Sequence, residues 1–336
     1  MKRTSAVPAL RRRRLLEAIG ATALLYPIAG ETQQTARVAK VAWTSVDRTN
    51  PQSPFLVAFR DAMRGLGWRE GHNLVLDAWW GEGSLDGLKK RVPEILAKRP
   101  DVIVAAGGPA TRAMIDTKVD LPVAFTSSAD VVIAKIVDSW ARPGGNRTGI
   151  SFFALELIPK RIELIKQALP GMKRVAIVGW PPHAGELLEL EAAANAAQQL
   201  GLEHKYWGVN SAPELDAAMD ALAQWNADAM LVFAGAISTT YPDRIAAFAA
   251  RKRIPAFSSW SDFAEKGNVM AYGPILKECY ARLASFVDRI LKGARPSDLP
   301  VERPTKFELV VNLAAAKALG IQIPQSILVR ADRVIE

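Results

Sequence analysis

The chain has 336 residues, of which 49% are hydrophobic and 23% are charged, and its formal net charge at pH 7 is +9. This length is sufficient for two domains with full cores, and the composition is that of a globular protein rather than a disordered one. The first 32 residues carry a net charge of +4, and the remaining +5 is spread along the chain without a basic run. The charge pattern therefore disfavours nucleic acid as a partner.

Residues 1–32 have the order of an export signal. Four arginines at positions 11–14 precede a short apolar stretch over residues 18–30, and Glu31 follows it. The stretch is too short to span a bilayer, and a charged segment followed by an apolar one is typical of secretory signals. The run Arg12-Arg-Arg-Leu-Leu16 is similar to a twin-arginine signal. We therefore expect export to the periplasm, with a frayed basic helix on a cytosolic protein as the alternative.

The first half of the chain alternates strands with helices. The pattern predicts strands over residues 37–44, 73–80, 102–106 and 121–125, and helices over residues 54–66, 84–98, 110–117 and 131–140. Residues 102–106 are apolar throughout, which is typical of a strand buried on both faces of a parallel sheet. Residues 141–149 contain three glycines and a proline and cannot continue a helix or a central strand. We expect the chain to cross there to a second lobe.

The second half repeats the cycle. It predicts helices over residues 157–169, 186–200, 212–225, 241–252 and 276–292, and strands over residues 174–179, 203–208, 229–233, 254–257, 269–272 and 307–311. Such alternation indicates parallel sheets with right-handed crossovers, so both halves belong to the doubly wound α/β class. We expect the helix from residue 276 to pack on the first lobe and the last strand and helix to rejoin the second.

These expectations define the domains. The predicted first lobe comprises residues 37–143 and 274–300, and the second comprises residues 149–271 and 304–336. Hinges are expected near residues 141–149, 271–274 and 300–305. Gly144 and Gly145 would supply the backbone freedom for closure at the first of them.

The candidate site lies beyond the carboxyl ends of the strands, where ligands of open parallel sheets bind. The residues there are mainly hydroxyls, glycines, two aspartates and two tryptophans, which suit a small polar or zwitterionic ligand with an apolar portion. The serines and threonines have an alternative role as helix caps. The candidate ligand-binding residues are Ser45, Asp47, Gly107, Gly108, Pro109, Thr111, Ser127, Ser128, Asp130, Trp180, Pro181, Gly235, Ser258, Ser259, Trp260 and Tyr272.

Groups for catalysis or metal binding are scarce in the sequence. His72, His183 and His204 are far apart and show no metal-ligand spacing, and neither a Gly-x-Ser-x-Gly elbow nor a Walker-type loop occurs. The single cysteine, Cys279, cannot form an internal disulfide and lies at helical spacing from apolar residues, which predicts a buried thiol. We therefore expect no enzyme activity, no cofactor and no metal, with an enzyme in the cleft as the alternative.

Several longer motifs resemble one family, the substrate-binding proteins of ABC transporters that include tryptophan- and tyrosine-binding importer components. The motifs are Pro143-Gly-Gly-Asn-Arg-Thr-Gly149, Met270-Ala-Tyr-Gly-Pro274, Phe286-Val-Asp-Arg-Ile-Leu-Lys-Gly293, Pro296-x-Asp-Leu-Pro300, Pro304-Thr-Lys-Phe-Glu-Leu-Val-Val-Asn312 and Ala316-Lys-Ala-Leu-Gly320. The resemblance implies a type I periplasmic binding protein with two Rossmann-like lobes, three hinge crossovers and a ligand trapped by closure. It also implies a monomer that delivers its ligand to an ABC permease; a sensory receptor is the alternative.

Two departures from the family pattern concern the site. Many members carry Ser-Asp-Pro after the last strand of the first lobe, where this chain has Ser128-Ala-Asp-Val131. Contact between Asp130 and a ligand amine is therefore a hypothesis. Members often have Asn-Pro after the first strand of the second lobe, where this chain has Gly179-Trp-Pro-Pro182. Trp180 could add a stacking wall or narrow the site.

Overall fold

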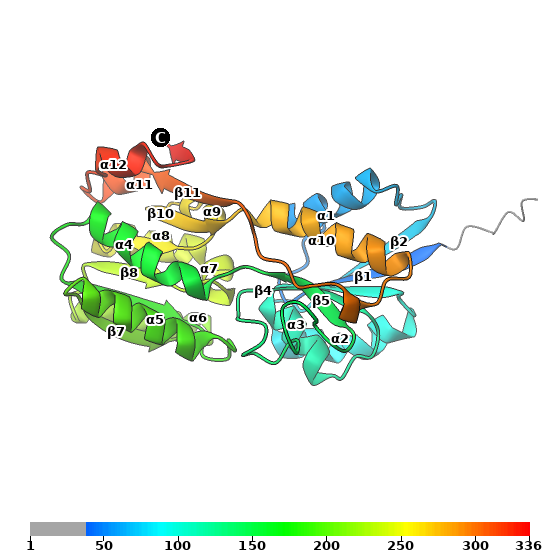
Figure 1. The fold of residues 1–336 in the computed structure, drawn as a ribbon. Coiled ribbons are helices and arrows are strands. Elements are labelled where there is room, and N and C mark those ends of the chain that lie inside the picture. Colours follow the sequence, from blue (N-terminus) through cyan, green and yellow to red (C-terminus); the bar gives the residue numbers. More distant parts are fainter. Residues whose placement is uncertain (1–37) are drawn as a thin grey trace, which may run out of the picture. The chain divides into compact units, whose positions relative to one another are not determined.

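The computed structural model describes residues 38–336, and the predicted export signal at residues 1–32 lies outside the described residues. Within residues 38–336, no helix has both the length and the apolar character required to cross a bilayer. Two sheets of mostly parallel strands with flanking helices organise this part of the chain (Figure 1). The doubly wound α/β class predicted from the sequence is confirmed.

The first sheet has five parallel strands in the order β2-β1-β3-β4-β5. Its central strand is buried along its whole length because its five residues are all apolar, so helices can cover both faces. The strands are β1 (Ala39–Ser45), β2 (Leu74–Trp80), β3 (Val102–Ala106), β4 (Val123–Ser127) and β5 (Arg147–Ser151), and the intervening helices are α1 (Pro54–Gly65), α2 (Leu85–Ala97) and α3 (Gly108–Asp116). We call this sheet and its helices the first lobe.

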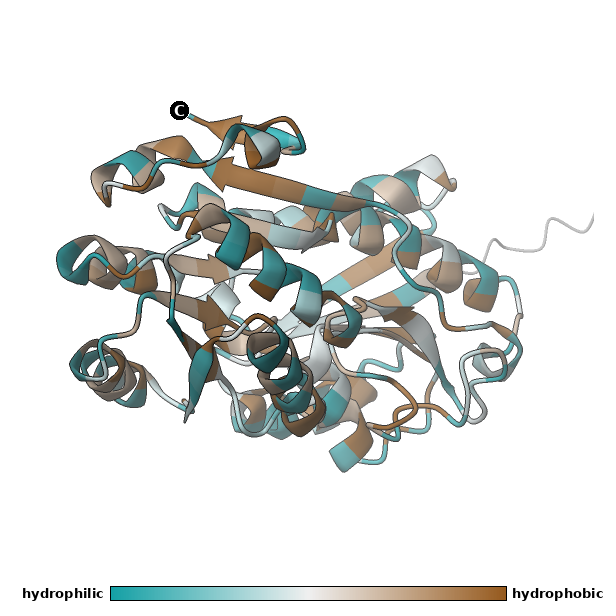
Figure 2. Cartoon of the chain, turned by 60° about the vertical axis from the view of Figure 1, so that its left-hand side comes forward, coloured by the Kyte–Doolittle hydropathy of each residue, from teal (hydrophilic) through white to brown (hydrophobic). Residues whose placement is uncertain are grey.

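The second sheet has seven strands in the order β12-β11-β10-β9-β8-β6-β7, and only its β10–β11 pair is antiparallel. Its strands are largely hydrophobic, whereas the helices carry hydrophilic residues as well (Figure 2). The strands are β6 (Arg174–Gly179), β7 (Glu203–Gly208), β8 (Ala229–Val232), β9 (Ala256–Ser258), β10 (Met270–Pro274), β11 (Phe307–Asn312) and β12 (Arg333–Ile335). This sheet and the helices around it form the second lobe.

The helices of the second lobe follow its strands closely. Most were predicted by apolar residues at helical spacing, but α7, α9 and α12 were not, because helices of four or five residues are too short to show a period. The helices are η1 (Leu155–Leu157), α4 (Ile158–Ala168), α5 (Glu186–Gln199), α6 (Ala212–Gln224), α7 (Ala236–Thr240), α8 (Pro242–Lys252), α9 (Ser261–Glu265), α11 (Leu313–Ala318) and α12 (Gln325–Leu328).

Helix α10 (Leu276–Leu291) comes from the second half of the chain but packs on the first lobe beside α1 (Figure 1). Its residues Leu283 and Phe286 belong to the same buried cluster as Phe59 and Met63 of α1. Cys279 is a free thiol in this cluster, and burial raises its pKa to about 12. The cysteine is therefore part of the core, as its spacing predicted.

The predicted helix over residues 131–140 is absent, and the chain forms successive turns there. Asp130 initiates them, because its Oδ1 accepts hydrogen bonds from the amides of Val132 and Ile133, each at 2.9 Å. Three consecutive β-branched residues weaken helix formation, and the carboxylate offers their amides a competing acceptor. The helix prediction was wrong for this local reason.

Three segments carry the chain between the lobes. Crossover 1 (residues 152–154) follows β5, and crossover 2 (residues 274–275) joins β10 to α10. After α10 the chain forms a short 3-10 helix, η2 (Pro296–Asp298), and crossover 3 (residues 302–306) then leads to β11. Because β5 pairs with β4 from Arg147 to Ser151, the chain leaves the first sheet later than the predicted crossing at residues 141–149. Residues 149–151 thus belong to the first lobe, and Gly144 and Gly145 lie in the loop before β5. Hinge motion at the three segments stays a prediction.

Gly149 offers a test of this placement of β5. An added Cβ would overlap the Phe125 carbonyl oxygen of β4, whereas a Cβ at Gly145 would meet no atom within 4 Å. We expect Gly149→Ala to lower the free energy of unfolding by about 3 kcal/mol, because the sheet must shift. Gly145→Ala, the matched control, should lose about 1 kcal/mol from its left-handed backbone alone. Urea denaturation of both variants measures the difference, and equal losses would contradict this placement.

Candidate functional site

A cavity lies between loops at the carboxyl ends of first-lobe strands and loops that follow β8 and β9 of the second lobe. Crossover 1 and the start of α10 also contribute to its lining. We call it the interlobe cavity. Its lining residues are Ser45, Val46, Asp47, Phe55, Ala106, Gly107, Gly108, Pro109, Ser128, Phe152, Gly235, Ala236, Thr239, Thr240, Trp260, Leu276 and Tyr280.

Four aromatic rings form a continuous wall of the interlobe cavity. Phe55 and Tyr280 stack with ring centroids 4.9 Å apart, and Tyr280 is 6.1 Å from Phe152. Phe152 then meets Trp260 of the second lobe edge-to-face at 5.4 Å. The wall therefore spans from the first lobe through crossover 1 to the second lobe, and it suits a flat apolar or aromatic group.

Hydrogen bonds fix the Tyr280 side of this wall. The Tyr280 hydroxyl accepts a hydrogen bond from Thr126 Oγ1 at 3.3 Å, and Thr126 Oγ1 in turn accepts one from the Gly107 amide at 2.7 Å. Burial raises the pKa of Tyr280, so its hydroxyl stays neutral. The network ties α10 to the loop after β3 and leaves the ring as a rigid surface.

Residues that line the interlobe cavity carry two kinds of donor with no hydrogen-bond partner within residues 38–336. Helix α3 begins at Gly108, and first-turn amides of a helix lack intrahelical acceptors and favour negative charge. Trp260 is 3% exposed, and its Nε1 is buried with no hydrogen-bond partner among the described residues. Buried donors are normally paired, so an acceptor group on a ligand is the natural partner for this indole.

Asp47 is the one residue with a formal charge among those that line the interlobe cavity. Ser45 Oγ donates a hydrogen bond to Asp47 Oδ2 at 2.7 Å, and the Asp47 amide donates one to Ser45 Oγ at 3.2 Å. This small turn holds the carboxylate at the end of β1. A single carboxylate beside aromatic walls favours a ligand that carries a cationic amine.

The structure brings half of the sequence-predicted site residues to this cavity. Another two, Ser127 and Trp180, line a neighbouring groove that also includes Gly108 and Pro109. Contact with a ligand stays a prediction for all of them. The predicted residues that line the interlobe cavity are Ser45, Asp47, Gly107, Gly108, Pro109, Ser128, Gly235 and Trp260.

The remaining predicted residues lie outside both the cavity and the groove, and three of them have local structural roles. Thr111 Oγ1 donates to the carbonyls of Gly107 and Thr126, and Ser258 Oγ donates to the Val232 carbonyl. Asp130 holds the turns that follow it. Pro181, Ser259 and Tyr272 complete this set. Thr111 thus has a structural role, but it is not the helix cap of the stated alternative, because the N-cap of α3 is Gly107 and Thr111 Oγ1 donates to carbonyls.

Sequence reasoning missed most of the aromatic and threonine lining. Phe55, Leu276 and Tyr280 lie on helix faces that also pack in the core, so their periodicity indicated burial and not a cavity. Thr239 and Thr240 belong to α7, which was not predicted. One usable signal was the four-residue spacing of Leu276 and Tyr280, which places both on one side of α10.

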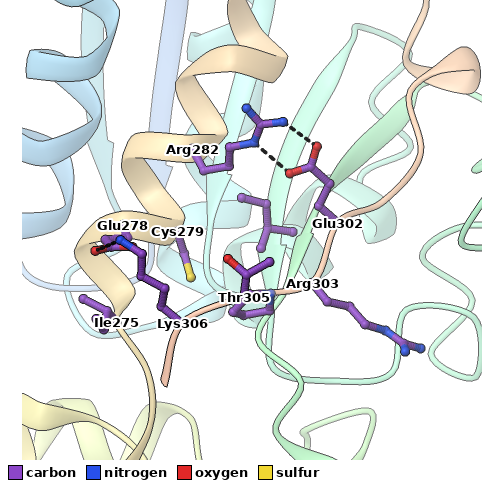
Figure 3. A pocket seen from close by; sticks show the side chains of 10 residues that line it. Ile275, Glu278, Cys279, Arg282, Glu302, Arg303, Thr305 and Lys306 are labelled. Carbon is purple, nitrogen blue, oxygen red and sulfur yellow. Dashed lines mark hydrogen bonds and ion pairs between the residues drawn. The ribbon is translucent and has the colours of Figure 1, made fainter. Parts of the chain in front are cut away.

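The opposite side of α10 borders a second pocket, the α10 groove, formed with crossover 3 (Figure 3). Arg282 makes a bidentate contact with Glu302, with both N–O distances at 2.8 Å, and Lys306 Nζ lies 3.1 Å from Glu278 Oε1. Cys279 points between these pairs, whereas Arg303 points away (Figure 3). The two ion pairs join α10 to crossover 3, and within each pair the positive and negative charges neutralise each other.

A buried group of titratable residues lies beside the neighbouring groove in the second lobe. His183 Nε2 is 3.0 Å from Glu189 Oε1, and the Tyr206 hydroxyl donates to Glu186 Oε1 at 2.7 Å. Burial raises the pKa of Glu186 to about 7, and the charge of Glu189 adds to this effect. Burial alone would lower the pKa of His183, but the hydrogen bond and charge of Glu189 outweigh it and raise the pKa.

No group of three or more metal-binding side chains occurs within residues 38–336.

Comparisons with known proteins agree on one protein family. A family model described as ABC transporter substrate binding protein matches residues 56–335. Over 264 residues the chain is 22% identical to a tyrosine-binding protein from Clostridioides difficile (strain R20291), which covers 79% of this chain and 76% of that protein.

Solved structures with the same fold are also similar. A conserved domain protein from Vibrio cholerae O1 biovar El Tor is 26% identical with a TM-score of 0.82, over 89% of this chain and all of that one. An ABC domain from Streptococcus pneumoniae in complex with L-Trp is 24% identical with a TM-score of 0.80, over 88% of this chain and 99% of that one.

The raised pKa of Glu186 predicts a pH dependence of stability. Its pKa is about 7 in the folded chain and near 4.5 when exposed, so its contribution is fully present below pH 4.5. The contribution is lost as the pH rises through 7, and the shift sets a limit of about 3 kcal/mol. Glu186→Gln keeps an acceptor for Tyr206 but cannot ionise.

The measurement is the free energy of unfolding between pH 5 and pH 8 for the wild type and Glu186→Gln. We expect the wild type to lose stability across this range and the variant to show a smaller slope. Glu203→Gln, on the exposed end of β7, is the control and should keep the wild-type slope. A variant slope identical to the wild type would contradict the raised pKa.

Proposed function

Because the chain belongs to the ABC transporter substrate-binding protein family, we propose that it is the exported solute receptor of an importer. It captures an amino-acid-like ligand in the interlobe cavity and delivers it to a membrane permease. The observation that carries this proposal is that both lobes contribute to the aromatic wall of one cavity. Tyr280 on the first lobe and Trp260 of the second lobe both contact the Phe152 ring, and all three residues line the cavity. A ligand there would favour the closed arrangement over an open one.

The chemistry of the wall points to a zwitterionic ligand with an aromatic or other flat apolar side chain. The side chain stacks along Phe55, Tyr280 and Phe152, and the ammonium group pairs with Asp47. The carboxylate accepts hydrogen bonds from the α3 amides and from Trp260 Nε1. Two similar proteins support this class of ligand, since one is named as tyrosine-binding and another was solved with L-Trp.

Binding without chemistry fits the residues available. Among those that line the interlobe cavity, one is a carboxylate and none is a histidine, cysteine or lysine. The lining serine, threonine and tyrosine hydroxyls therefore have no lining histidine or lysine to activate them as nucleophiles. We propose that the protein acts as a monomer in the periplasm and needs no cofactor. The arginine-rich, then apolar, order of residues 1–32 supports export.

The first experiment is a thermal-shift screen of the purified full chain with the twenty amino acids, aromatic amines and aromatic acids, followed by calorimetry. We expect aromatic L-amino acids to raise the melting temperature, because a ligand that binds only the folded state stabilises it by mass action. A broad library in which no compound raises the melting temperature would contradict the proposed function.

Asp47 provides a sharper test of how the ligand is held. We expect Asp47→Asn to weaken binding of L-tryptophan by about ten- to a hundredfold, because a charge-assisted contact with the ammonium is lost. Binding of indole-3-propionate, which lacks the amine, should change little. Asp61→Asn is the matched control, since Asp61 pairs with Arg64 on the exposed side of α1. Equal affinities of the wild type and Asp47→Asn for L-tryptophan would exclude Asp47 as the amine partner.

A further inference from the structure

Arg161 is a buried arginine of the second lobe whose side chain ends between crossover 1 and the strand β10, which leads into crossover 2. It lies on α4 and is 3% exposed. Its Nε donates a hydrogen bond to the Tyr272 carbonyl at 2.8 Å, and its Nη1 donates one to the Ala154 carbonyl at 3.0 Å. Ala154 is the last residue of crossover 1, and Tyr272 lies in β10, two residues before crossover 2. One guanidinium group therefore links the end of crossover 1 to the strand that leads into crossover 2.

We propose that Arg161 is a positioning residue that holds crossovers 1 and 2 at a fixed spacing, so that the lobes move about one defined axis. The proposal rests on the proposed function, because a defined axis matters for a protein that closes on a ligand. Arg161 does not line the interlobe cavity, so it acts through the crossovers and not through ligand contact.

The surroundings of Arg161 favour this role over that of an ordinary ion pair. Although the charge of Glu189 acts on Arg161, no carboxylate of the described residues lies within the 4.0 Å of an ion pair with it. Burial lowers the pKa of Arg161 to about 10, so the group remains cationic at neutral pH. The two carbonyls therefore receive charge-assisted hydrogen bonds, which are stronger than neutral ones.

Gly273 lies beside the Arg161 guanidinium, but the close approach that requires a glycine there is to the Ser259 carbonyl and not to Arg161. A Cβ on Gly273 would overlap the Ser259 carbonyl oxygen and would lie 3.5 Å from Arg161 Nη2. The planar fork of arginine can serve two acceptors that lie in different segments, whereas lysine presents a single charged nitrogen. The guanidinium of Arg161 is thus suited to link the Ala154 and Tyr272 carbonyls.

Crossover 1 is held from its other side by a second arginine. Arg303 of crossover 3 lies over the Trp140 ring at 4.1 Å and over the Phe153 ring at 5.0 Å. Phe153 has a φ of 58°, which is unusual for a bulky residue and persists only where the surroundings impose it. Arg161 and Arg303 therefore confine adjacent residues of crossover 1. Arg161 extends this restraint by hydrogen bonds to β10, which is also connected to Phe153 through the Phe307 ring.

The test compares Arg161→Met and Arg161→Lys with Arg174→Met in the full chain without ligand. Arg174 is a matched control, because its Nη1 donates to the Trp225 carbonyl at 2.7 Å within the second lobe, away from the crossovers. Spin labels at Lys90→Cys on α2 and Asp220→Cys on α6 report the interlobe distance by pulsed electron paramagnetic resonance. Cys279 is buried and should remain unlabelled.

We expect Arg161→Met to widen the interlobe distance distribution about twofold, because two crossovers lose their common restraint. Arg161→Lys should give an intermediate width, and Arg174→Met should keep the wild-type width even where it lowers the melting temperature equally. A wild-type width in both Arg161 variants would overturn the proposal. If Arg161→Met fails to fold, the Arg161→Lys comparison decides alone.

Binding of L-tryptophan separates this proposal from the proposed function. If the wild type binds L-tryptophan, we expect Arg161→Lys to lower its association rate several-fold and to leave the preference over indole-3-propionate unchanged. If the wild type binds no amino acid, the proposed function fails, but the distance distributions still decide the role of Arg161. An unchanged association rate together with an unchanged distribution would show that Arg161 only stabilises the fold.

Discussion

The packing of α10 against α1 is the interaction on which the rest of the structure depends. Buried apolar side chains such as Leu283, Phe286 and Val287 join Phe59 and Met63 in one cluster, and each contributes about 2 kcal/mol of hydrophobic stabilisation. This packing draws a segment from the second half of the chain back to the first lobe. The chain must then cross between the lobes three times instead of once, which restricts the paths along which they can move.

The same helix also organises the site. Its first two turns present Leu276 and Tyr280 to the interlobe cavity, whereas Cys279 and Arg282 border the α10 groove on the other side. A displacement of α10 would therefore alter the aromatic wall and the ion pairs to crossover 3 together. The network from Tyr280 through Thr126 to the Gly107 amide opposes such displacement. The wall of the interlobe cavity and the interlobe geometry thus share one structural element.

The electrostatic character of the interlobe cavity follows from how few charges line it. Asp47 is not balanced by a lining arginine or lysine, so in the proposed binding mode the carboxylate of the ligand relies on amide and indole donors. Such preorganised dipoles carry no formal charge, and they avoid burying a cation when the cavity is empty. This arrangement favours a net neutral zwitterion or a cation over an anion.

Much of the fold could be predicted because its signals are long and periodic. The sequence patterns at residues 102–106 and from residue 276 each favour one type of element, a buried strand and an amphipathic helix, and the structure contains both. The first crossing was misplaced because glycines mark a turn without showing whether a strand follows. The strand Arg147–Ser151 is short and begins with polar residues, so only its pairing with β4 reveals it.

The site was harder to predict than the fold for a related reason. An aromatic residue on an apolar helix face has the same sequence signal whether it packs in the core or lines a cavity, as Phe55 and Tyr280 illustrate. Conversely, the polar residues Thr111 and Asp130 follow strands as binding residues do, yet they bond to nearby backbone groups. Only tertiary contacts separate these cases.

The most direct test of the central claim is the indole N–H resonance of Trp260 in a ¹⁵N-labelled protein titrated with L-tryptophan. The resonance is assigned with Trp260→Phe, and the Trp207 and Trp225 pair, which pack against each other at 5.7 Å within the second lobe, serve as internal references. The account predicts that the Trp260 resonance shifts on saturation while the reference resonances do not. Saturable binding that leaves Trp260 unchanged would contradict the interlobe cavity as the ligand site.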